Sequence, residues 1–178
     1  MIDYESYNKI IQYLDKGDLN KLRLYVEKEK EKTYLKNART ALPSYLVSNL
    51  GIGYLDDGKI FLSDGYSLYV LNSNEILTSK QKESQKTMSM RNLVFLLNEL
   101  ENYEKRQYVV IGETKNPIPS EKKVISVDGS VCHFFSQKSF NYSKKFLGED
   151  ALYKICTDKP ICLAESEKGK GLILGLRK

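Results

Sequence analysis

The sequence predicts an α+β protein in which helices pack on curved antiparallel sheets, preceded by an N-terminal helical hairpin. Three observations support this fold class. Apolar residues recur at helical spacing in several separate segments, and apolar residues alternate with polar ones in the stretches between them. Asp-Gly pairs, which accept the positive φ of tight turns, stand between neighbouring strand patterns, as at Asp57-Gly58 and Asp64-Gly65.

Residues 1–36 are predicted to form the helical hairpin, packed on a main α+β domain of residues 37–178. Gly17 is expected to end the first helix, and Asp18 is placed to cap the second. The apolar residues at helical spacing are Tyr7, Ile10, Ile11, Leu14, Leu22, Tyr25 and Val26.

The rest of the chain is predicted as strands interrupted by two further helices. Pro43 marks the boundary, and strands are expected over 45–47, 51–55, 59–62 and 67–71, before a polar connection of residues 72–87. Ser89 is expected to cap a helix whose stripe is Leu93, Leu96, Leu97, Leu100 and Tyr103. Later strands are expected over 107–112, 123–127, 131–135, 152–156, 161–165 and 171–176. Between them stand a polar loop at 114–121, a turn at Asp128-Gly129, a helix at 140–147 ended by Gly148, and a turn at 168–171.

Composition favours a cytoplasmic protein without a membrane span. The chain has 178 residues, three cysteines and a net charge of +5, and no apolar run reaches about 18 residues. The N-terminus lacks the basic and apolar regions of a secretory signal. Residues 80–145 carry 12 Lys and Arg against 7 Asp and Glu, a basic excess that fits either a nucleic-acid surface or an ordinary lysine-rich one.

The patterns that carry catalysis, metals or cofactors are absent from the sequence. His133 is the single histidine and adjoins Cys132 in a predicted strand, where neighbours point to opposite faces. His133 is therefore expected on the strand surface or as a satisfied buried histidine. Cys156 and Cys162 are expected to pack in the core, and Gly169-Lys170-Gly171 lacks the spacing of a phosphate loop. We interpret the chain as a non-enzymatic binding or scaffold protein with no cofactor and no metal.

Four segments resemble the bacterial replication sliding clamp family, the β subunit of DNA polymerase III. Residues 58–68 (GKIFLSDGYSL) are similar to the family's D-G-K-L and T-D-G-x-R-L segment, and residues 140–147 (FNYSKKFL) to its F-N-x-x-Y-L helix. Residues 159–163 (KPICL) and 171–177 (GLILGLR) are similar to its K-P-V-x-I and L-I-M-P-M-R strands. The helix at 89–103 takes the place of another family helix. Ser67, Gly175 and Lys178 stand where the family has Arg, Pro and Leu.

The resemblance implies a DNA clamp fold of about one domain, with helices on one side of the sheets. It also implies a cleft for partner peptides, whose candidate residues here are Asp64, Gly65, Tyr66, Leu68, Leu174, Leu176 and Arg177. A clamp presents Lys and Arg to DNA phosphates without reading bases. The candidate DNA contacts are Lys86, Arg91, Lys105, Arg106, Lys138, Lys144 and Lys145, although Glu99 and Glu101 lie on the same helix as Arg91.

Two functions follow as expectations. The first is a sliding-clamp-like processivity or tethering factor in DNA replication that binds double-stranded DNA, a polymerase or a clamp loader, and that assembles as a homo-oligomer. The alternative is an interaction or regulatory module of clamp fold, from a phage or mobile element, that does not encircle DNA. The N-terminal helical hairpin favours the alternative, because the family has no equivalent extension.

Overall fold

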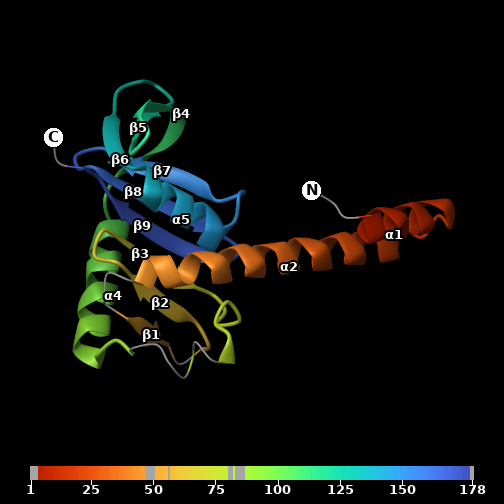
Figure 1. Ribbon diagram of the computed structural model, residues 1–178. Coiled ribbons are helices and arrows are strands. Elements are labelled where there is room, and N and C mark those ends of the chain that lie inside the picture. Colours follow the sequence, from red (N-terminus) through yellow and green to blue (C-terminus); the bar gives the residue numbers. More distant parts are fainter. Residues whose placement is uncertain (1–3, 47–50, 56, 80–81, 83–86, 177–178) are drawn as a thin grey trace. The chain divides into compact units, whose positions relative to one another are not determined.

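The computed structural model describes residues 4–46, 51–55, 57–79, 82 and 87–176 (Figure 1). The chain divides into two compact units, residues 1–36 and 37–178, which we describe one at a time. No helix in the described part of the chain is both long and apolar enough to cross a membrane.

The first unit is a pair of helices joined by a tight turn. Helix α1 spans Tyr4–Asp15, and α2 spans Leu19–Tyr45, of which the part up to Lys36 belongs to this unit. Gly17 adopts a positive φ of 64° between them, as the sequence predicts. The two helices meet where the Tyr13 and Tyr25 rings lie 5.9 Å apart and the Tyr25 hydroxyl donates to Ser6 Oγ at 3.0 Å.

Helix α2 continues to Tyr45, so the predicted boundary at Pro43 and the predicted strand at 45–47 are wrong as far as the described residues go. Val47 lies outside the described residues. Pro43 occupies the last turn of α2, where it lacks the N–H that would donate to the preceding turn and is followed by only two more helical residues. The buried side chains of this end recur at helical spacing and pack in the second unit: Ala38, Ala41, Leu42 and Tyr45. Burial of this stripe outweighs the local signal of the proline.

The second unit is built on one antiparallel sheet in the order β1-β2-β3-β9-β8-β7-β4-β5-β6. The strands are β1 Ile52–Tyr54, β2 Ile60–Ser63, β3 Ser67–Leu71, β4 Tyr108–Ile118, β5 Glu121–Ser126, β6 Cys132–Ser136, β7 Leu152–Cys156, β8 Ile161–Ser166 and β9 Gly169–Leu174. Helix α4 spans Met90–Glu104 and α5 spans Gln137–Leu147. The prediction of an α+β protein with antiparallel strands is confirmed.

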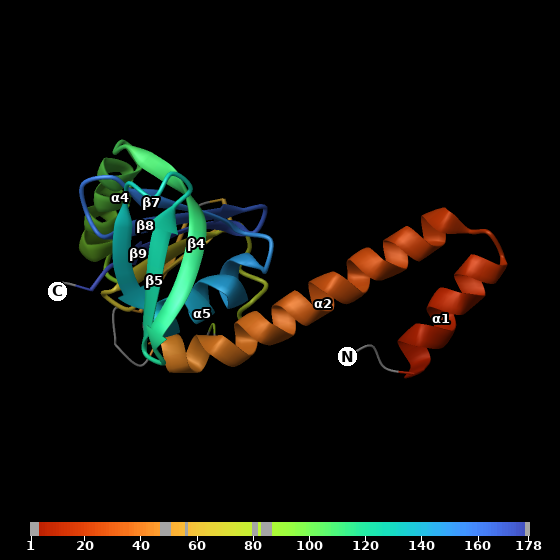
Figure 2. The same cartoon turned by 90° about the horizontal axis from the view of Figure 1, so that it is seen from above.

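The last six strands of this order close on themselves. Gly175, directly after β9, forms an antiparallel bridge with Phe135 of β6, and the Leu176 N–H donates to the Phe134 carbonyl at 2.8 Å. Strand β5 pairs with β4 on one side and with β6 on the other, and β4 and β5 lie side by side in Figure 2. A Cβ at Gly175 would stand 2.6 Å from the Pro160 carbonyl oxygen. Close backbone approach therefore explains why glycine occupies this position.

The two faces of the sheet carry separate apolar clusters, because neighbouring residues of a strand point to opposite faces. Leu172 and Leu68 belong to the cluster that includes Leu93 and Leu100 of α4. Ile173 belongs to the cluster that includes Phe140 of α5. Tyr69, next to Leu68, packs its ring 5.2 Å from Phe146 of α5. Helices α4 and α5 therefore cover opposite faces, and the expectation of helices on one side of the sheets is wrong.

Turn and cap signals place most element ends where the sequence predicts them. Positive φ values at Gly58, Gly65 and Gly129 form the turns of three hairpins. The Ser89 hydroxyl caps α4 by accepting from the Asn92 N–H, and Gly148 ends α5 with a φ of 93°. These features are local, so the sequence pattern reveals them directly.

Strands β4 and β9 extend into segments that the sequence predicts as a loop and a turn. Residues 114–121, expected as a loop, mostly continue β4 to Ile118 and pair with β5, with a bulge that accommodates Pro117. Strand β9 starts at Gly169, inside the expected turn, because this glycine pairs with Leu71 of β3. In the predicted polar connection at 72–87, Ile76 and Leu77 are buried, while residues 80–81 and 83–86 lie outside the described part.

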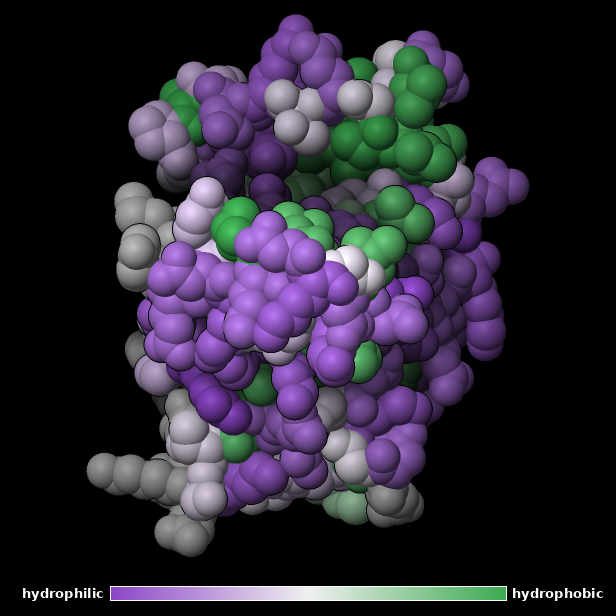
Figure 3. All heavy atoms as spheres, turned by 90° about the vertical axis from the view of Figure 1, so that its right-hand side faces the viewer, coloured by the Kyte–Doolittle hydropathy of each residue, from purple (hydrophilic) through white to green (hydrophobic). Residues whose placement is uncertain are grey.

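Hydrophilic residues dominate the surface seen in Figure 3, and apolar side chains gather in its upper part, at the height of β4–β7 in Figure 1. Exposed apolar residues of these elements include Val110, Ile118 and Leu152.

Candidate functional site

The structure brings together most residues of the predicted partner cleft. The β2–β3 turn carries Asp64, Gly65 and Tyr66, and β3 pairs with β9 so that Leu68 lies opposite Leu172. The Leu174 N–H donates to the Tyr66 carbonyl at 2.9 Å, which fixes the end of β9 beside the turn. Leu176 instead lies beside β6, and Arg177 lies outside the described residues.

A groove of about 130 Å³ runs between this turn, the end of β9 and α4. We call it the Tyr66 groove. Its lining is mainly apolar and comes from three segments: Ser63, Gly65, Tyr66, Ser67, Leu68, Phe95, Leu96, Glu99, Tyr103, Leu172 and Leu174. The Tyr66 and Phe95 side chains are 71% and 61% exposed, so two large aromatic residues stand open at its rim. Single exposed apolar residues are common, but two aromatic residues beside an apolar groove mark a surface suited to contact.

Asp64 holds the turn rather than lining the groove. Its Oδ1 accepts hydrogen bonds from the Tyr66 N–H at 2.9 Å and from the Ser67 N–H at 2.7 Å. The Ser67 hydroxyl donates to the same oxygen at 3.1 Å. This is the usual way in which an aspartate organises a turn, and Gly65 supplies the positive φ of 86°. The effect is a fixed backbone that presents the Tyr66 side chain outward.

Ser67 links this turn to the end of α2. The residue is 2% exposed, and its carbonyl accepts a hydrogen bond from the buried Tyr45 hydroxyl at 2.8 Å. Burial raises the pKa of Tyr45 well above its usual value, so the hydroxyl stays a donor. A long, charged arginine in place of Ser67 would have to displace this network. A small serine is therefore compatible with a turn that is hydrogen-bonded to the buried Tyr45 hydroxyl.

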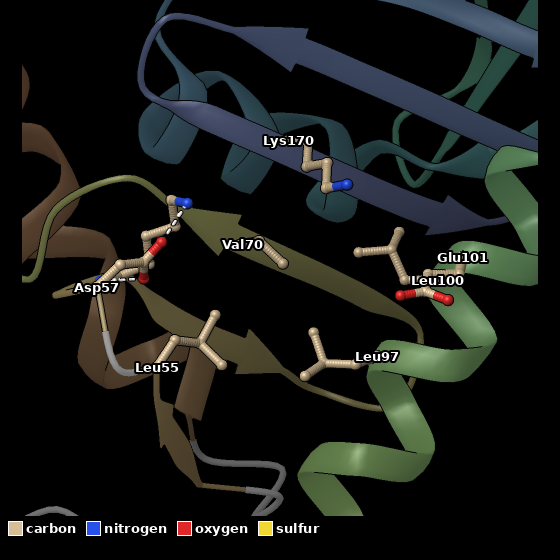
Figure 4. A pocket seen from close by; sticks show the side chains of 8 residues that line it. Leu55, Asp57, Val70, Leu97, Leu100, Glu101 and Lys170 are labelled. Carbon is tan, nitrogen blue, oxygen red and sulfur yellow. Dashed lines mark hydrogen bonds and ion pairs between the residues drawn. The ribbon is translucent and has the colours of Figure 1, made fainter.

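A second, larger hollow lies along α4, next to β2, β3 and β9 (Figure 4). We call it the Leu97 groove. It measures about 500 Å³, and Leu97 and Leu100 of α4 point across it toward Leu55 and Val70. Its rim is charged: Asp57 pairs with Lys59, Lys170 pairs with Glu104, and Glu101 also lines it. A single helix about 10 Å wide cannot cover several strands spaced about 4.8 Å apart, which leaves these hollows beside α4.

The predicted DNA contacts do not form one surface. Arg91 is exposed on α4, Lys105 caps its C-terminal end, and Arg106 forms an ion pair with Asp158 at 3.0 Å and lies over the Tyr103 ring. Lys138, Lys144 and Lys145 lie on α5, on the opposite face of the sheet. Lys86 lies outside the described residues.

The basic side chains of α5 have mixed surroundings. Lys138 lies over the Tyr142 ring at 5.6 Å, Lys144 forms an ion pair with Glu149 at 2.9 Å, and Lys145 is exposed. Nearby on β5, burial and then the Lys144 ammonium lower the pKa of Lys122. A locally positive region therefore lies around α5.

Burial and hydrogen bonds account for the positions of two of the three cysteines and of the histidine. Cys132 is exposed, whereas Cys156 and Cys162 are buried in the clusters of opposite faces, as core packing predicts. A His133 ring nitrogen lies 2.8 Å from the Cys156 carbonyl oxygen, so the histidine is satisfied by the backbone. Among the described residues, no group of three His, Cys, Asp or Glu is arranged to hold a metal ion.

Sequence reasoning missed the contribution of α4 to the Tyr66 groove. It assigned Leu96 and Tyr103 to the core stripe and gave no role to Phe95, which stands just off that stripe. An aromatic residue on the polar side of an amphipathic helix is the signal that could have indicated it.

Comparisons of this chain with protein-family models, with curated proteins and with solved structures return no match.

Proposed function

We propose that this chain is a non-enzymatic protein-interaction module of clamp-like fold, associated with DNA replication, that holds an extended segment of a partner protein in the Tyr66 groove. One observation carries the proposal. The β2–β3 turn and the end of β9, the two segments that resemble the cleft of the clamp family, line one apolar groove together with α4.

The placement of the helices favours this module over a ring around DNA. Encirclement requires a layer of helices that turns its basic residues toward the duplex. Helices α4 and α5 cover opposite faces of the sheet, and α4 carries Glu99, Glu101 and Glu104 against Arg91. A tethering role through a bound partner segment needs no such layer.

Charge defines the partner segment further. Glu99 lines the Tyr66 groove and, within the described part of the chain, makes no ion pair. The groove floor is apolar, and Tyr66 and Phe95 offer aromatic faces that attract cations. The segment that fits best carries apolar side chains flanked by Lys or Arg, because charge complementarity sets orientation and specificity.

The test uses two pools of fluorescent peptides that share the same apolar residues and differ only in basic or acidic flanks. Fluorescence polarisation with the full chain should show preference for the basic pool. Glu99→Lys should move the preference to the acidic pool, and Phe95→Ala should weaken binding about tenfold, as loss of an aromatic anchor does.

Glu149→Lys provides the matched control, because Glu149 pairs with Lys144 of α5, away from the groove. This variant should keep the preference of the unmodified protein. Absence of binding to both pools, or binding that Phe95→Ala leaves unchanged, would overturn the proposal.

Duplex DNA is a second candidate ligand, favoured by the positive region around α5. Helix α5 carries Lys138, Lys144 and Lys145 and no acidic residue, and the Lys144 ammonium adds to the effect of burial in lowering the pKa of Lys122. A polyanion would be attracted to these cations. Binding to phosphates alone would be independent of sequence and would weaken steeply with salt.

This candidate is tested by gel shift of a short duplex across a salt series. Lys138→Glu and Lys145→Glu should abolish the shift, whereas Arg91→Glu, on the opposite face, should retain it. Equal loss in all three variants, or no shift at low salt, would reject α5 as a DNA surface.

A further inference from the structure

The described residues of the N-terminal unit form no buried core of their own. Within residues 5–36 of the structure, every side chain is at least partly exposed. Five large apolar side chains are substantially exposed, with exposed fractions from 38% to 67%: Tyr7, Ile11, Leu14, Leu19 and Leu24. A unit below about 40 residues seldom stands alone without disulfides, metals or association. We therefore expect another protein surface to bury these apolar side chains.

Helix α1 has two different sides. One side meets α2: Ser6 accepts from the Tyr25 hydroxyl, Tyr13 packs on the Tyr25 ring, and Lys9 lies over it. Tyr7, Ile11 and Leu14 follow the spacing i, i+4 and i+7, which forms a separate stripe on α1. We call these three residues the Ile11 stripe. Packing against α2 leaves this stripe uncovered.

The charges of the unit fit a second copy of the chain. Residues 1–36 contain eight Lys and Arg and seven Asp and Glu, so the unit carries a net charge of +1. Two copies of this unit therefore meet without strong repulsion between them. The polar positions of α1 include Glu5, Asn8, Gln12 and Asp15 beside one Lys9, without the basic excess that draws amphipathic helices to anionic membranes.

We propose that two copies of the chain associate through their Ile11 stripes, so that the paired hairpins form an antiparallel four-helix bundle. A twofold interface uses the same patch on both subunits, and Ile11 lies at the middle of the stripe. Antiparallel α1 helices then set Tyr7 of one copy near Leu14 of the other. A parallel arrangement would bring the two Asp15 carboxylates together, a like-charge contact that costs stability.

Light scattering coupled to size-exclusion chromatography of the full chain tests this association. The expected mass is twice the 20.5 kDa of one chain. Leu14→Glu should reduce it to that of one chain, because the new charge enters the interface. Gln12→Glu adds the same charge to α1 outside the stripe and should keep the mass of the unmodified protein.

Disulfide trapping gives a second readout that does not depend on a disruptive variant. In a Cys132→Ser background, which removes the exposed thiol, Ile11→Cys should form a dimer on oxidation and Gln12→Cys should not. A single-chain mass at every concentration, or equal trapping of both cysteine variants, overturns the proposal. Capture of a single-chain species by phosphatidylserine vesicles overturns it as well.

Discussion

Tyr45 and Asp64 fix the backbone that presents the Tyr66 groove. The Tyr45 hydroxyl and the Asp64 carboxylate both bind Ser67, one from the core and one from the turn. Only Tyr66 of this group is largely exposed. A buried network therefore supports an exposed side chain, the arrangement that a preorganised contact surface needs.

Tyr45→Phe should lower the free energy of unfolding by about 1 kcal/mol, because it removes one buried hydrogen bond and little volume. The Ser67 carbonyl keeps the Ser63 hydroxyl as a donor at 3.2 Å, which limits the loss. Urea unfolding followed by circular dichroism measures the change. Tyr66→Phe removes an exposed hydroxyl and should leave the midpoint unchanged; equal effects of both substitutions would contradict the role of Ser67.

Asp128 should make stability depend on pH in acid. Hydrogen bonds from Ser126 and Ser130 lower its pKa from the ordinary value of 3.8 to about 2. A carboxyl with a lowered folded pKa stabilises the fold above its unfolded pKa, and this contribution disappears as the pH falls through the folded value. Stability should therefore decline as the pH falls from about 4 to about 2, and less so in Asp128→Asn.

Urea unfolding at several pH values measures this dependence. Ser130→Ala removes one donor to Asp128 and should shift the acid decline toward that of Asp128→Asn. Identical acid profiles in Asp128→Asn and the unmodified protein would exclude this turn as a source of the dependence.

The pairing of β3 with β9 is the seam on which the candidate site depends, because it joins two parts of the chain that are distant in sequence. Gly169 pairs with Leu71 at one end of the seam, and Ser67 pairs with Ile173 at the other. Gly169 has a φ of 144°, and a Cβ there would stand 2.9 Å from the Leu71 Cα and closer still to the Val70 carbonyl oxygen. Only glycine fits this approach.

Gly169→Ala should lower the free energy of unfolding by about 3 kcal/mol or more, since it combines an unfavourable φ with a backbone clash. Gly58→Ala is the matched control: its φ of 80° is also positive, but no atom lies within 4 Å of an added Cβ. The control should lose only about 1–2 kcal/mol. Chemical denaturation of both variants compares the two values, and equal losses would show that the seam tolerates the added methyl group.

The second unit, residues 37–178, encloses two of its three cysteines on opposite sides of one sheet. Cys156 donates to the Asp158 carboxylate at 2.9 Å, and burial raises the pKa of both Cys156 and Cys162. Neither thiol is therefore accessible or ionised near neutral pH.

A thiol reagent should label Cys132 rapidly in the folded protein and reach Cys156 and Cys162 only after denaturation. Mass spectrometry of labelled peptides follows the three sites separately. Cys132→Ser should remove the fast phase. Rapid labelling of Cys162 in the folded chain would mean that the sheet opens far more readily than its burial indicates.

Several turns and helix ends could be predicted from the sequence, because they depend on neighbouring residues. The Asp-Gly turns, the Ser89 cap and the Gly148 end depend on residues within a few positions of one another. The contact between Tyr66 and Leu174, which the resemblance to clamp segments implies, is present, whereas Leu176, assigned to the same cleft, lies beside β6. The predicted end of α2 at Pro43 is wrong. The proline is visible in the local sequence, whereas the burial of Tyr45 that extends the helix depends on the tertiary structure.

No local pattern in the sequence predicts on which face of the sheet each helix lies. Strand alternation assigns Leu172 and Ile173 to two different faces, but no pattern in the sequence states which face receives α4 and which receives α5. That choice depends on strand order and on how the whole chain packs. It separates the basic residues of α5 from those of α4, and it sets Phe95 and Glu99 beside the Tyr66 groove.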